Sequence, residues 1–403
     1  MQTYDALVVG GGPAGLAAAA TLAMTGASVA LIALDAVPTA ASTTPPDTRT
    51  AALFTGSLAL LRYVGAFDHL ADAITPLRGI RIVDDGDGLL RAPEVTFEAH
   101  EMGLADFGAN VPQQALGRAL RYACGRLSDL KMISGQMVRL NSSATGIDVG
   151  LADGATLSAR LVVAADGRNS LSRIARGIET ETWDYPQVAI AAQFAHSRAH
   201  HGISTEFHRS SGPCTVVPMP GKRSSLVWVE SPVIAKRLTA LDDAAFARAL
   251  EGRLHGILGT VSDMGARRMF PLTCLKAKLL AKDRVVLVGE AGHTLPPIGA
   301  QGLNLGLRDV AVLADLVADA RASGEDIGSD ALCSAYDNAR RTDIMVRATA
   351  VDWLNRSLLA DFLPADLARG LGLHVVGSIG ALKRRVMQAG FEPSGSLPRL
   401  MRG

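Results

Sequence analysis

Three glycine-rich segments carry residue types that could build a nucleotide site. The first contains Gly10, Gly12, Pro13, Ala14 and Gly15, with the spacing G-x-G-x-x-G, between a β-branched run and an alanine-rich run. In such a turn the first glycine permits the bend, the second lets the backbone approach a pyrophosphate, and the third allows close helix–strand packing. The helix that follows offers free N–H groups and a partial positive charge to an anion. The segment predicts a dinucleotide site.

The position that usually binds a ribose departs from this pattern. An acidic side chain is expected at the end of the second strand, about 20 residues after the glycines. Ala33 stands there, and Asp35 lies two residues later. We expect Asp35 to act as the substitute and the ribose contact to be looser than usual.

The other two segments point to a flavin. Asp166 and Gly167 follow a predicted strand, although an Asp-Gly pair alone predicts only a turn. The longer third segment covers Val288–Val310, and in it Glu290 directly follows a buried strand, where its carboxylate can accept hydrogen bonds from a ribityl chain. A stretch rich in proline and glycine leaves room for a flat ring. A helix then begins near Gly302, and its N–H groups can stabilise the negative charge of a reduced flavin.

Hydrophobic periodicity predicts the elements that must hold these segments. The first is a right-handed βαβ unit made of a strand, a helix and a strand, at Ala6–Val9, Leu16–Thr25 and Ser28–Ile32. Pro38–Asp47 is rich in proline, serine and threonine, and we expect an exposed, mobile loop there. Further helices are expected at Thr50–Tyr63, Gln113–Leu127 and Leu303–Arg321, and antiparallel strands at Lys131–Val163 and Gln187–Val229.

Composition excludes several classes of protein. Of the 403 residues, 48% are hydrophobic and 20% are charged, which is typical of a globular chain and not of a disordered one. The net charge of +1 argues against a nucleic-acid partner held by bulk electrostatics. We expect no signal peptide and no membrane-spanning segment, and therefore a cytoplasmic protein. The four cysteines are scattered and are expected to be buried free thiols.

The histidines give no strong sign of a metal site. His200, His201 and His208 fall in the strand-rich part of the chain, with Glu206 nearby, and we expect polar surface there rather than metal ligands. His293 lies in the third glycine-rich segment. We expect it to have a packing and hydrogen-bonding role.

Together the three segments resemble the class A FAD-dependent aromatic hydroxylases, the family of p-hydroxybenzoate hydroxylase, over residues 4–345. The resemblance implies that Asp166 belongs to a motif serving both FAD and NAD(P)H. It implies that Glu290 replaces the usual aspartate in contact with the ribityl chain, and that Arg49 and Pro297 lie close to the flavin. The other residues that it assigns to FAD are Gly10, Gly12, Gly15, Gln113, Gly299, Gln301, Gly302, Leu303 and Asn304.

Within that family the chain looks like the hydroxylases of ubiquinone biosynthesis, on the stretches Asp47–Leu53, Gly212–Pro218, Ser224–Trp228 and Gln301–Asp309. The resemblance implies a monooxygenase that hydroxylates the ring of a polyprenylated ubiquinone precursor, using NAD(P)H and O2 through a flavin hydroperoxide. The sequence identifies no catalytic base. Two alternatives stay open: a reductase or oxidase of the same fold, and a non-catalytic FAD-binding subunit of a quinone-biosynthesis complex.

The expected fold is α/β, with a Rossmann-type FAD-binding domain, an inserted antiparallel-sheet substrate domain and a helical C-terminal tail. We expect the FAD-binding domain at 1–75, 100–178 and 272–345, the substrate domain at 76–99 and 179–271, and the tail at 346–403. In the tail, His374–Phe391 joins an apolar stripe to the basic run Lys383–Arg385. This pattern is typical of a helix on the inner face of a membrane, and also of an ordinary amphipathic helix that packs on the protein.

Overall fold

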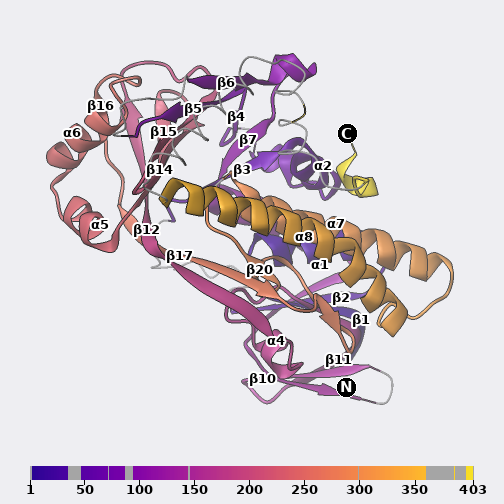
Figure 1. The fold of residues 1–403 in the computed structure, drawn as a ribbon. Coiled ribbons are helices and arrows are strands. Elements are labelled where there is room, and N and C mark those ends of the chain that lie inside the picture. Colours follow the sequence, from indigo (N-terminus) through magenta and orange to yellow (C-terminus); the bar gives the residue numbers. More distant parts are fainter. Residues whose placement is uncertain are drawn as a thin grey trace.

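The computed structural model describes residues 2–34, 47–70, 72–86, 94–143, 146–297, 299–359, 385 and 396–402. Figure 1 shows two large β-sheets, with two long helices running past both of them. These helices are α7 (Gln301–Ala322) and α8 (Asp330–Leu359), and they pack against each other. The expected α/β fold is confirmed.

The first sheet is built on the predicted βαβ unit. β1 (Gln2–Val9) and β2 (Val29–Ala33) are parallel neighbours joined by α1 (Pro13–Met24). Beside them lie three further parallel strands, which are β8 (Leu130–Ser134), β11 (Thr156–Ala164) and β19 (Val285–Leu287). An antiparallel extension consists of β9 (Met137–Ser142) and β10 (Ile147–Leu151), and β18 (Ala281–Lys282) forms the other edge. The sheet predicted at Lys131–Val163 is therefore antiparallel from β9 to β11, whereas β8 runs parallel to β2.

Alanine explains how closely the helices pack on this sheet. The nine residues from Gly15 to Ala23 of α1 are all buried. They lie against α3 (Gln113–Gly125) and α7. Small side chains on every side of α1 let its neighbours approach closely, which places the N-termini of α1 and α7 near each other.

The second sheet contains the strand-rich part of the chain. Its strands in spatial order are β20 (His293–Thr294), β17 (Arg268–Ala277), β12 (Thr180–His196), β15 (Arg223–Glu230), β14 (Gly212–Met219), β13 (Ile203–Arg209), β5 (Gly79–Asp84) and β6 (Val95–Glu98), with β16 (Val261–Ser262) beside β12. Phe194, Phe207 and Trp228 cover one face, where they pack with Phe246 of α6 (Asp243–Arg253). α5 (Pro232–Thr239) lies on the same side.

The helix expected at Thr50–Tyr63 is partly wrong. Thr50–Phe54 form β3, which pairs with β7 (Gly108–Pro112), and only Thr55–Tyr63 form a helix, α2. β4 (Thr75–Pro76) completes this small sheet. Local periodicity could not reveal the strand, because its pairing partner lies more than fifty residues further along the chain.

The remaining helices are short. α4 spans Leu171–Ala175, and 3₁₀ helices span Phe67–Leu70, Ala99–Met102, Gly289–Ala291 and Arg399–Met401. Of the expected helical tail, residues 351–359 belong to α8, whereas His374–Phe391 lie outside the described residues except for Arg385. Residues 35–46, which include Asp35 and most of the expected loop, also lie outside them. Within the described part of the chain, no helix is long and apolar enough to cross a membrane.

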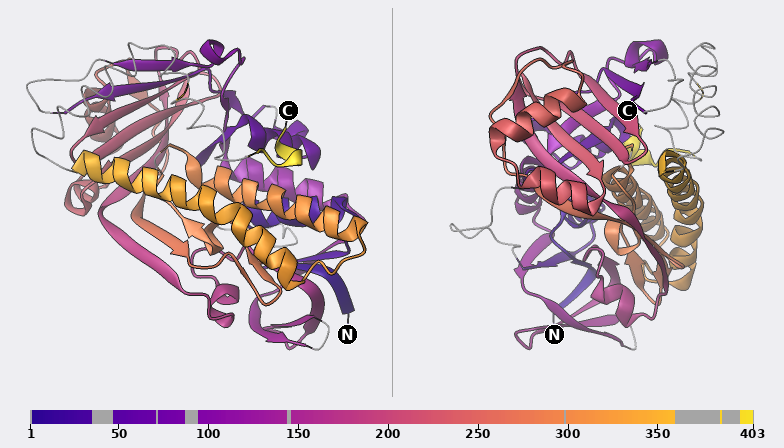
Figure 2. Two further views of the ribbon diagram at one scale, coloured as in Figure 1. Left: turned by 45° about the vertical axis from the view of Figure 1, so that its right-hand side comes forward. Right: turned by 60° about the vertical axis from the view of Figure 1, so that its left-hand side comes forward.

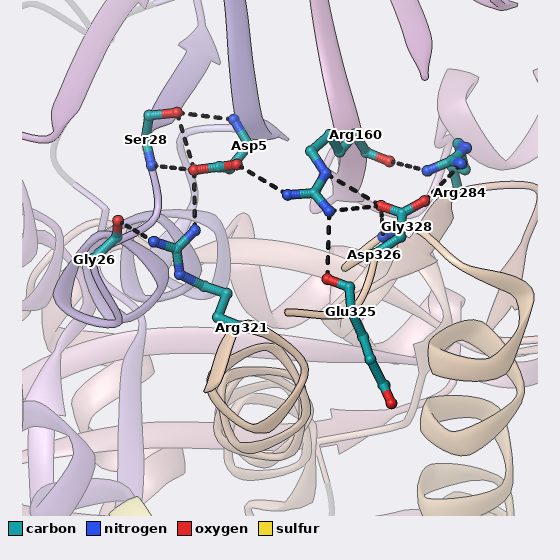
Figure 3. A network of polar contacts seen from close by, with 9 residues as sticks. All are labelled: Asp5, Gly26, Ser28, Arg160, Arg284, Arg321, Glu325, Asp326 and Gly328. Atoms are coloured by element: carbon teal, nitrogen blue, oxygen red, sulfur yellow. Dashed lines mark hydrogen bonds and ion pairs between the residues drawn. The ribbon is translucent and has the colours of Figure 1, made fainter. Parts of the chain in front are cut away.

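Ion pairs tie the first sheet to the end of α7 (Figure 3). Arg321 donates to Asp5 at 3.1 Å, and Arg284 pairs with Asp326 at 2.7 Å. Arg160 lies between them and donates to Asp326 at 3.2 Å. These contacts fix α7 relative to β1 and β11, so they help to hold the glycine-rich segments at the opposite ends of these strands.

Candidate functional site

The three glycine-rich segments meet in space, although 275 positions along the chain separate Ala14 from Gly289. A Cβ atom added to Gly10 would lie 2.1 Å from the carbonyl oxygen of Ala165, so the first segment touches the second. A Cβ added to Gly289 would lie 3.3 Å from Ala14, and one added to Gly306 would lie 3.1 Å from the Cα of Gly289. Only small residues allow these approaches.

Gly12 differs from its neighbours because open space surrounds it. An added Cβ there would meet no atom within 4 Å, whereas one at Gly15 would lie 2.0 Å from the carbonyl oxygen of Gly10. Gly12 is the N-cap of α1, and no side chain caps that helix. A helix N-terminus that faces open space fits a pyrophosphate group.

A second helix begins in the same neighbourhood without a side-chain cap. Gly299 and Ala300 both have positive φ angles, of 65° and 55°, and they turn the chain sharply into α7. A Cβ added to Gly302, in the first turn of α7, would meet no atom within 4 Å. Since Gly306 lies against Ala14, the N-termini of α1 and α7 are neighbours. This pair of helix ends fits the pyrophosphate and the ring of FAD.

Arg49 and Glu290 lie near the N-termini of α1 and α7. The Arg49 guanidinium pairs with Asp47 at 2.7 Å and stacks over the ring of Phe270, 5.2 Å from its centroid. The hydrogen bond from Arg49 to Asp47 raises the pKa of Arg49, and the charge of Glu290 raises it further. Glu290 itself is exposed, so its carboxylate is accessible to a ligand. The backbone N–H of Gln113 donates to the carbonyl oxygen of Arg49 at 3.1 Å, so the structure brings these three predicted residues together.

Two other predicted residues, Asp166 and Gln301, use their side chains in hydrogen bonds within the protein. Asp166 accepts hydrogen bonds from Ser170 Oγ at 2.6 Å and from the backbone N–H of Ser172 at 3.0 Å. Gln301 Oε1 accepts a hydrogen bond from Arg347 at 2.8 Å. These contacts orient both side chains, and their roles in binding FAD stay predictions, as do those of Pro297 and Leu303.

Asn304 is a structural link. Its side chain is 2% exposed, and its Oδ1 accepts from the N–H of Phe54 and from Ser57 Oγ, at 2.9 and 2.7 Å. Its Nδ2 donates to the carbonyl oxygens of Ala52 and Ala300, at 2.8 and 2.7 Å. The side chain of Asn304 therefore joins the start of α7 to β3 and α2. The assignment of Asn304 to the flavin remains a prediction.

A buried charge network below the site was not predicted. His293 Nε2 lies 2.7 Å from Asp309 Oδ2, and Asp309 Oδ1 accepts from Arg340 at 2.7 Å. Asp343 then accepts from Arg340 and Arg308, at 2.8 Å each. The expected hydrogen-bonding role of His293 is confirmed. The spacing of Arg340 and Asp343 on one helix could have suggested an ion pair, but not its burial.

The expectation of polar surface is wrong for Glu206 and His208. Their side chains are 15% and 11% exposed, and His208 Nε2 lies 2.5 Å from Glu206 Oε1. Their strand, β13, lies between β14 and β5 in the second sheet. His201 is exposed as expected, and the four cysteines are buried free thiols as predicted. The described residues contain no group of three or more His, Cys, Asp or Glu side chains that could hold a metal ion.

Comparisons with known proteins agree with this geometry. A family model described as an FAD binding domain matches residues 3–350. The ubiquinone hydroxylase UbiL of Rhodospirillum rubrum is 37% identical over 100% of this chain and 93% of its own length. The 3-demethoxyubiquinol 3-hydroxylase of Escherichia coli is 28% identical over 96% of this chain and 98% of its own length.

Solved structures show the same fold. The crystal structure of p-nitrophenol 4-monooxygenase PnpA from Pseudomonas putida superposes with a TM-score of 0.78 at 19% identity, covering 98% of this chain and 100% of that one. Klebsiella pneumoniae HpxO, complexed with FAD and uric acid, superposes with a TM-score of 0.73 at 18% identity, covering 97% of this chain and 96% of that one. From the family match, the relatives and the arrangement of its glycine-rich segments, the chain belongs to the FAD-dependent aromatic hydroxylases, and it is similar to their ubiquinone hydroxylases.

Proposed function

We propose that this chain hydroxylates the aromatic ring of a polyprenylated ubiquinone precursor, using FAD, NAD(P)H and O2. The observation that carries the proposal is the meeting of three distant segments at two uncapped helix N-termini, with Gly12 and Gly302 facing open space. The names of the relatives support the substrate class, since one is a ubiquinone hydroxylase and the other a 3-demethoxyubiquinol 3-hydroxylase.

FAD, when bound, supplies the redox chemistry, and the protein supplies binding, orientation and exclusion of water. The balanced reaction takes one ring C–H, O2, NAD(P)H and a proton, and gives ring C–OH, water and NAD(P)⁺. In this chain the N-terminus of α1 would hold the pyrophosphate, and Glu290 the ribityl chain. Leu295, Leu305 and Ala348 pack against the second sheet in a buried apolar cluster, which would help to exclude water from the neighbouring site.

The C-terminal tail supports a location for the reaction at a membrane surface. A polyprenyl chain resides in a membrane, and residues 374–391 combine an apolar stripe with the basic run Lys383–Arg385. A helix with this pattern of side chains would bind the surface of an anionic membrane. We propose that the protein meets its substrate at the cytoplasmic face of the membrane, through this contact or within a quinone-biosynthesis complex.

Oxygen consumption tests the proposed function. The purified protein with FAD is given NADH or NADPH, with and without a short-chain prenylated phenol, and oxygen uptake and product are measured. We expect the phenol to accelerate uptake and to be recovered with an added hydroxyl group. Oxygen uptake that leaves the phenol unchanged would indicate an oxidase. A protein that binds FAD tightly but takes up no oxygen, with or without the phenol, would indicate a non-catalytic subunit.

A further inference from the structure

Glu206 and His208 form a mostly buried carboxylate–imidazole pair on β13. His208 Nε2 lies 2.5 Å from Glu206 Oε1, and Thr215 Oγ1 donates to Glu206 Oε2 at 3.2 Å. These contacts join two residues of β13 and one residue of the neighbouring strand β14.

Strand pairing shows which side of the sheet carries the pair. Glu206 lies directly opposite Thr215, and Thr215 lies opposite Val227, so these three side chains share one face. Val227 packs against the cluster that contains Leu295 and Leu305, from the third glycine-rich segment and α7. The pair therefore lies on the side of the sheet that faces the flavin position.

Two neighbouring residues confirm the direction of this face. Ser225, two residues before Val227 on β15, contacts Thr50 Oγ1 at 2.8 Å, next to Arg49. Phe207, which alternates with Glu206 and His208 on β13, packs on the opposite face with α6. Because side chains alternate along a strand, Glu206 and His208 point toward the FAD-binding domain.

The hydrogen bonds define the protonation of the pair. Burial by itself would raise the pKa of Glu206, but the hydrogen bond from His208, the positive charge of His208 when it is protonated, and the hydrogen bond from Thr215 outweigh it and place the pKa below its ordinary value. An ionised carboxylate can only accept, so Nε2 of His208 carries the hydrogen that lies between them. In neutral His208 the lone pair is then on Nδ1. Among the described residues Nδ1 has no hydrogen-bond partner, and the side chain stays 11% exposed.

We propose that the Glu206–His208 pair accepts the proton of the hydroxyl group on the aromatic substrate. The substrate O–H bond breaks, a new N–H bond forms at His208 Nδ1, and the electron pair stays on the substrate oxygen. The ring thereby becomes richer in electrons at the carbon that receives oxygen. Glu206 keeps its hydrogen bond to Nε2 and balances the charge of the imidazolium. No electron moves to or from the pair, and the proton passes to water when the product leaves.

This inference rests on the proposed function, and the test separates the two. His208→Gln and Glu206→Gln are prepared in the full chain with FAD, and their bound FAD and circular dichroism are compared with the unmodified protein. The matched controls are His100→Gln and Glu98→Gln, in a pair with the same spacing whose side chains are 75% and 44% exposed. Each protein is assayed with a short-chain prenylated phenol and with a fluorinated analogue that is already ionised at the pH of the assay.

We expect both site variants to hydroxylate the ordinary phenol about 100-fold more slowly or worse, the usual range for losing a general base. The ionised analogue should restore their rate to within a few-fold of the unmodified protein, and the control variants should behave normally with both substrates. Equal slowing with the two substrates, or no slowing with either, would overturn the proposal. If the unmodified protein hydroxylates neither phenol, the proposed function itself is wrong.

Discussion

Gly10, Gly12 and Gly15 share one turn but are needed for different reasons. Gly10 and Gly15 leave room for the protein itself, since side chains there would collide with backbone oxygens at about 2 Å. At Gly12 a side chain would enter open space at the end of α1. The sequence motif predicted correctly that Gly10 and Gly15 permit close packing, and the pyrophosphate role of Gly12 stays a prediction.

Gly12→Val tests the pyrophosphate position. The variant should fold normally and lose FAD, because the branched side chain would occupy the space that a phosphate needs. Gly252→Val is the control, since an added Cβ at Gly252 of α6 also meets no atom within 4 Å, far from the site. FAD absorbance after gel filtration and thermal unfolding give the two readouts. Retention of FAD by a folded Gly12→Val protein would contradict the site.

Other residue roles could not be read from local sequence. Asn304 looks like part of a glycine-rich flavin loop, yet its side chain satisfies backbone groups about 250 residues away. Glu206 and His208 look like polar surface on an alternating strand, because the strand pattern does not reveal what covers each face. Contacts between distant segments decide these roles.

At the scale of elements, α7 is held from both of its ends. Arg321 fixes its C-terminal part to β1, and Asn304 fixes its first turns to β3 and α2. In between, Asp309 of α7 binds Arg340 of α8. The βαβ unit and α7 were predictable from periodicity and glycines. β3 was not, because its strand conformation depends on pairing with β7.

Removing the Asn304 side chain should loosen the start of α7. Asn304→Ala leaves buried donors and acceptors of Phe54, Ser57 and Ala52 without their partner. Each such group costs about 1–3 kcal/mol, so we expect a loss of roughly 2–4 kcal/mol in the free energy of unfolding. Asn141→Ala, at an exposed position of β9, should change little. Urea unfolding with FAD present measures both, and equal midpoints would refute the structural role of Asn304.

The buried charges predict a pH dependence. Burial would raise the pKa of Asp343, but Arg340 and Arg308 outweigh it and hold the pKa well below its usual range. The folded-state pKa is thus below the unfolded value of about 3.9. The stabilisation is complete above that pH and is lost as the pH falls through the folded-state pKa.

Asp343→Asn should therefore cost about 3–5 kcal/mol near neutral pH, since it removes the carboxylate that the buried Arg308 and Arg340 share. The difference from the unmodified protein should shrink as the pH falls below about 4. Asp243→Asn, which breaks the exposed pair with Arg267, is the control. Urea unfolding at several pH values measures the difference, and a gap that does not change with pH would argue against this network.

At the scale of the molecule, two strands connect the domains. β12 pairs with β17 from Thr180 to Ala191, and β17 continues to β20, which belongs to the third glycine-rich segment. α8 lies along α7 and reaches the second sheet, where Asp352 accepts from Tyr185 and Trp183 at 2.5 and 3.1 Å (Figure 2). β12, β17 and α8 therefore link the second sheet directly to the segments around the proposed flavin position.

We propose that the ring of a substrate lies between the second sheet and the N-terminus of α7. The domain boundaries that we propose follow the same division, since residues 79–98 and 180–277 contribute most strands of the second sheet.

The most direct test of this account is the origin of the oxygen in the product. The FAD-loaded protein is incubated with NAD(P)H, a short-chain prenylated phenol and ¹⁸O₂, and the product is examined by mass spectrometry. The account predicts a hydroxylated ring that carries a single heavy oxygen atom, formed only when both FAD and NAD(P)H are present. A product whose new oxygen comes from water, or a phenol recovered unchanged while NAD(P)H is consumed, would contradict it.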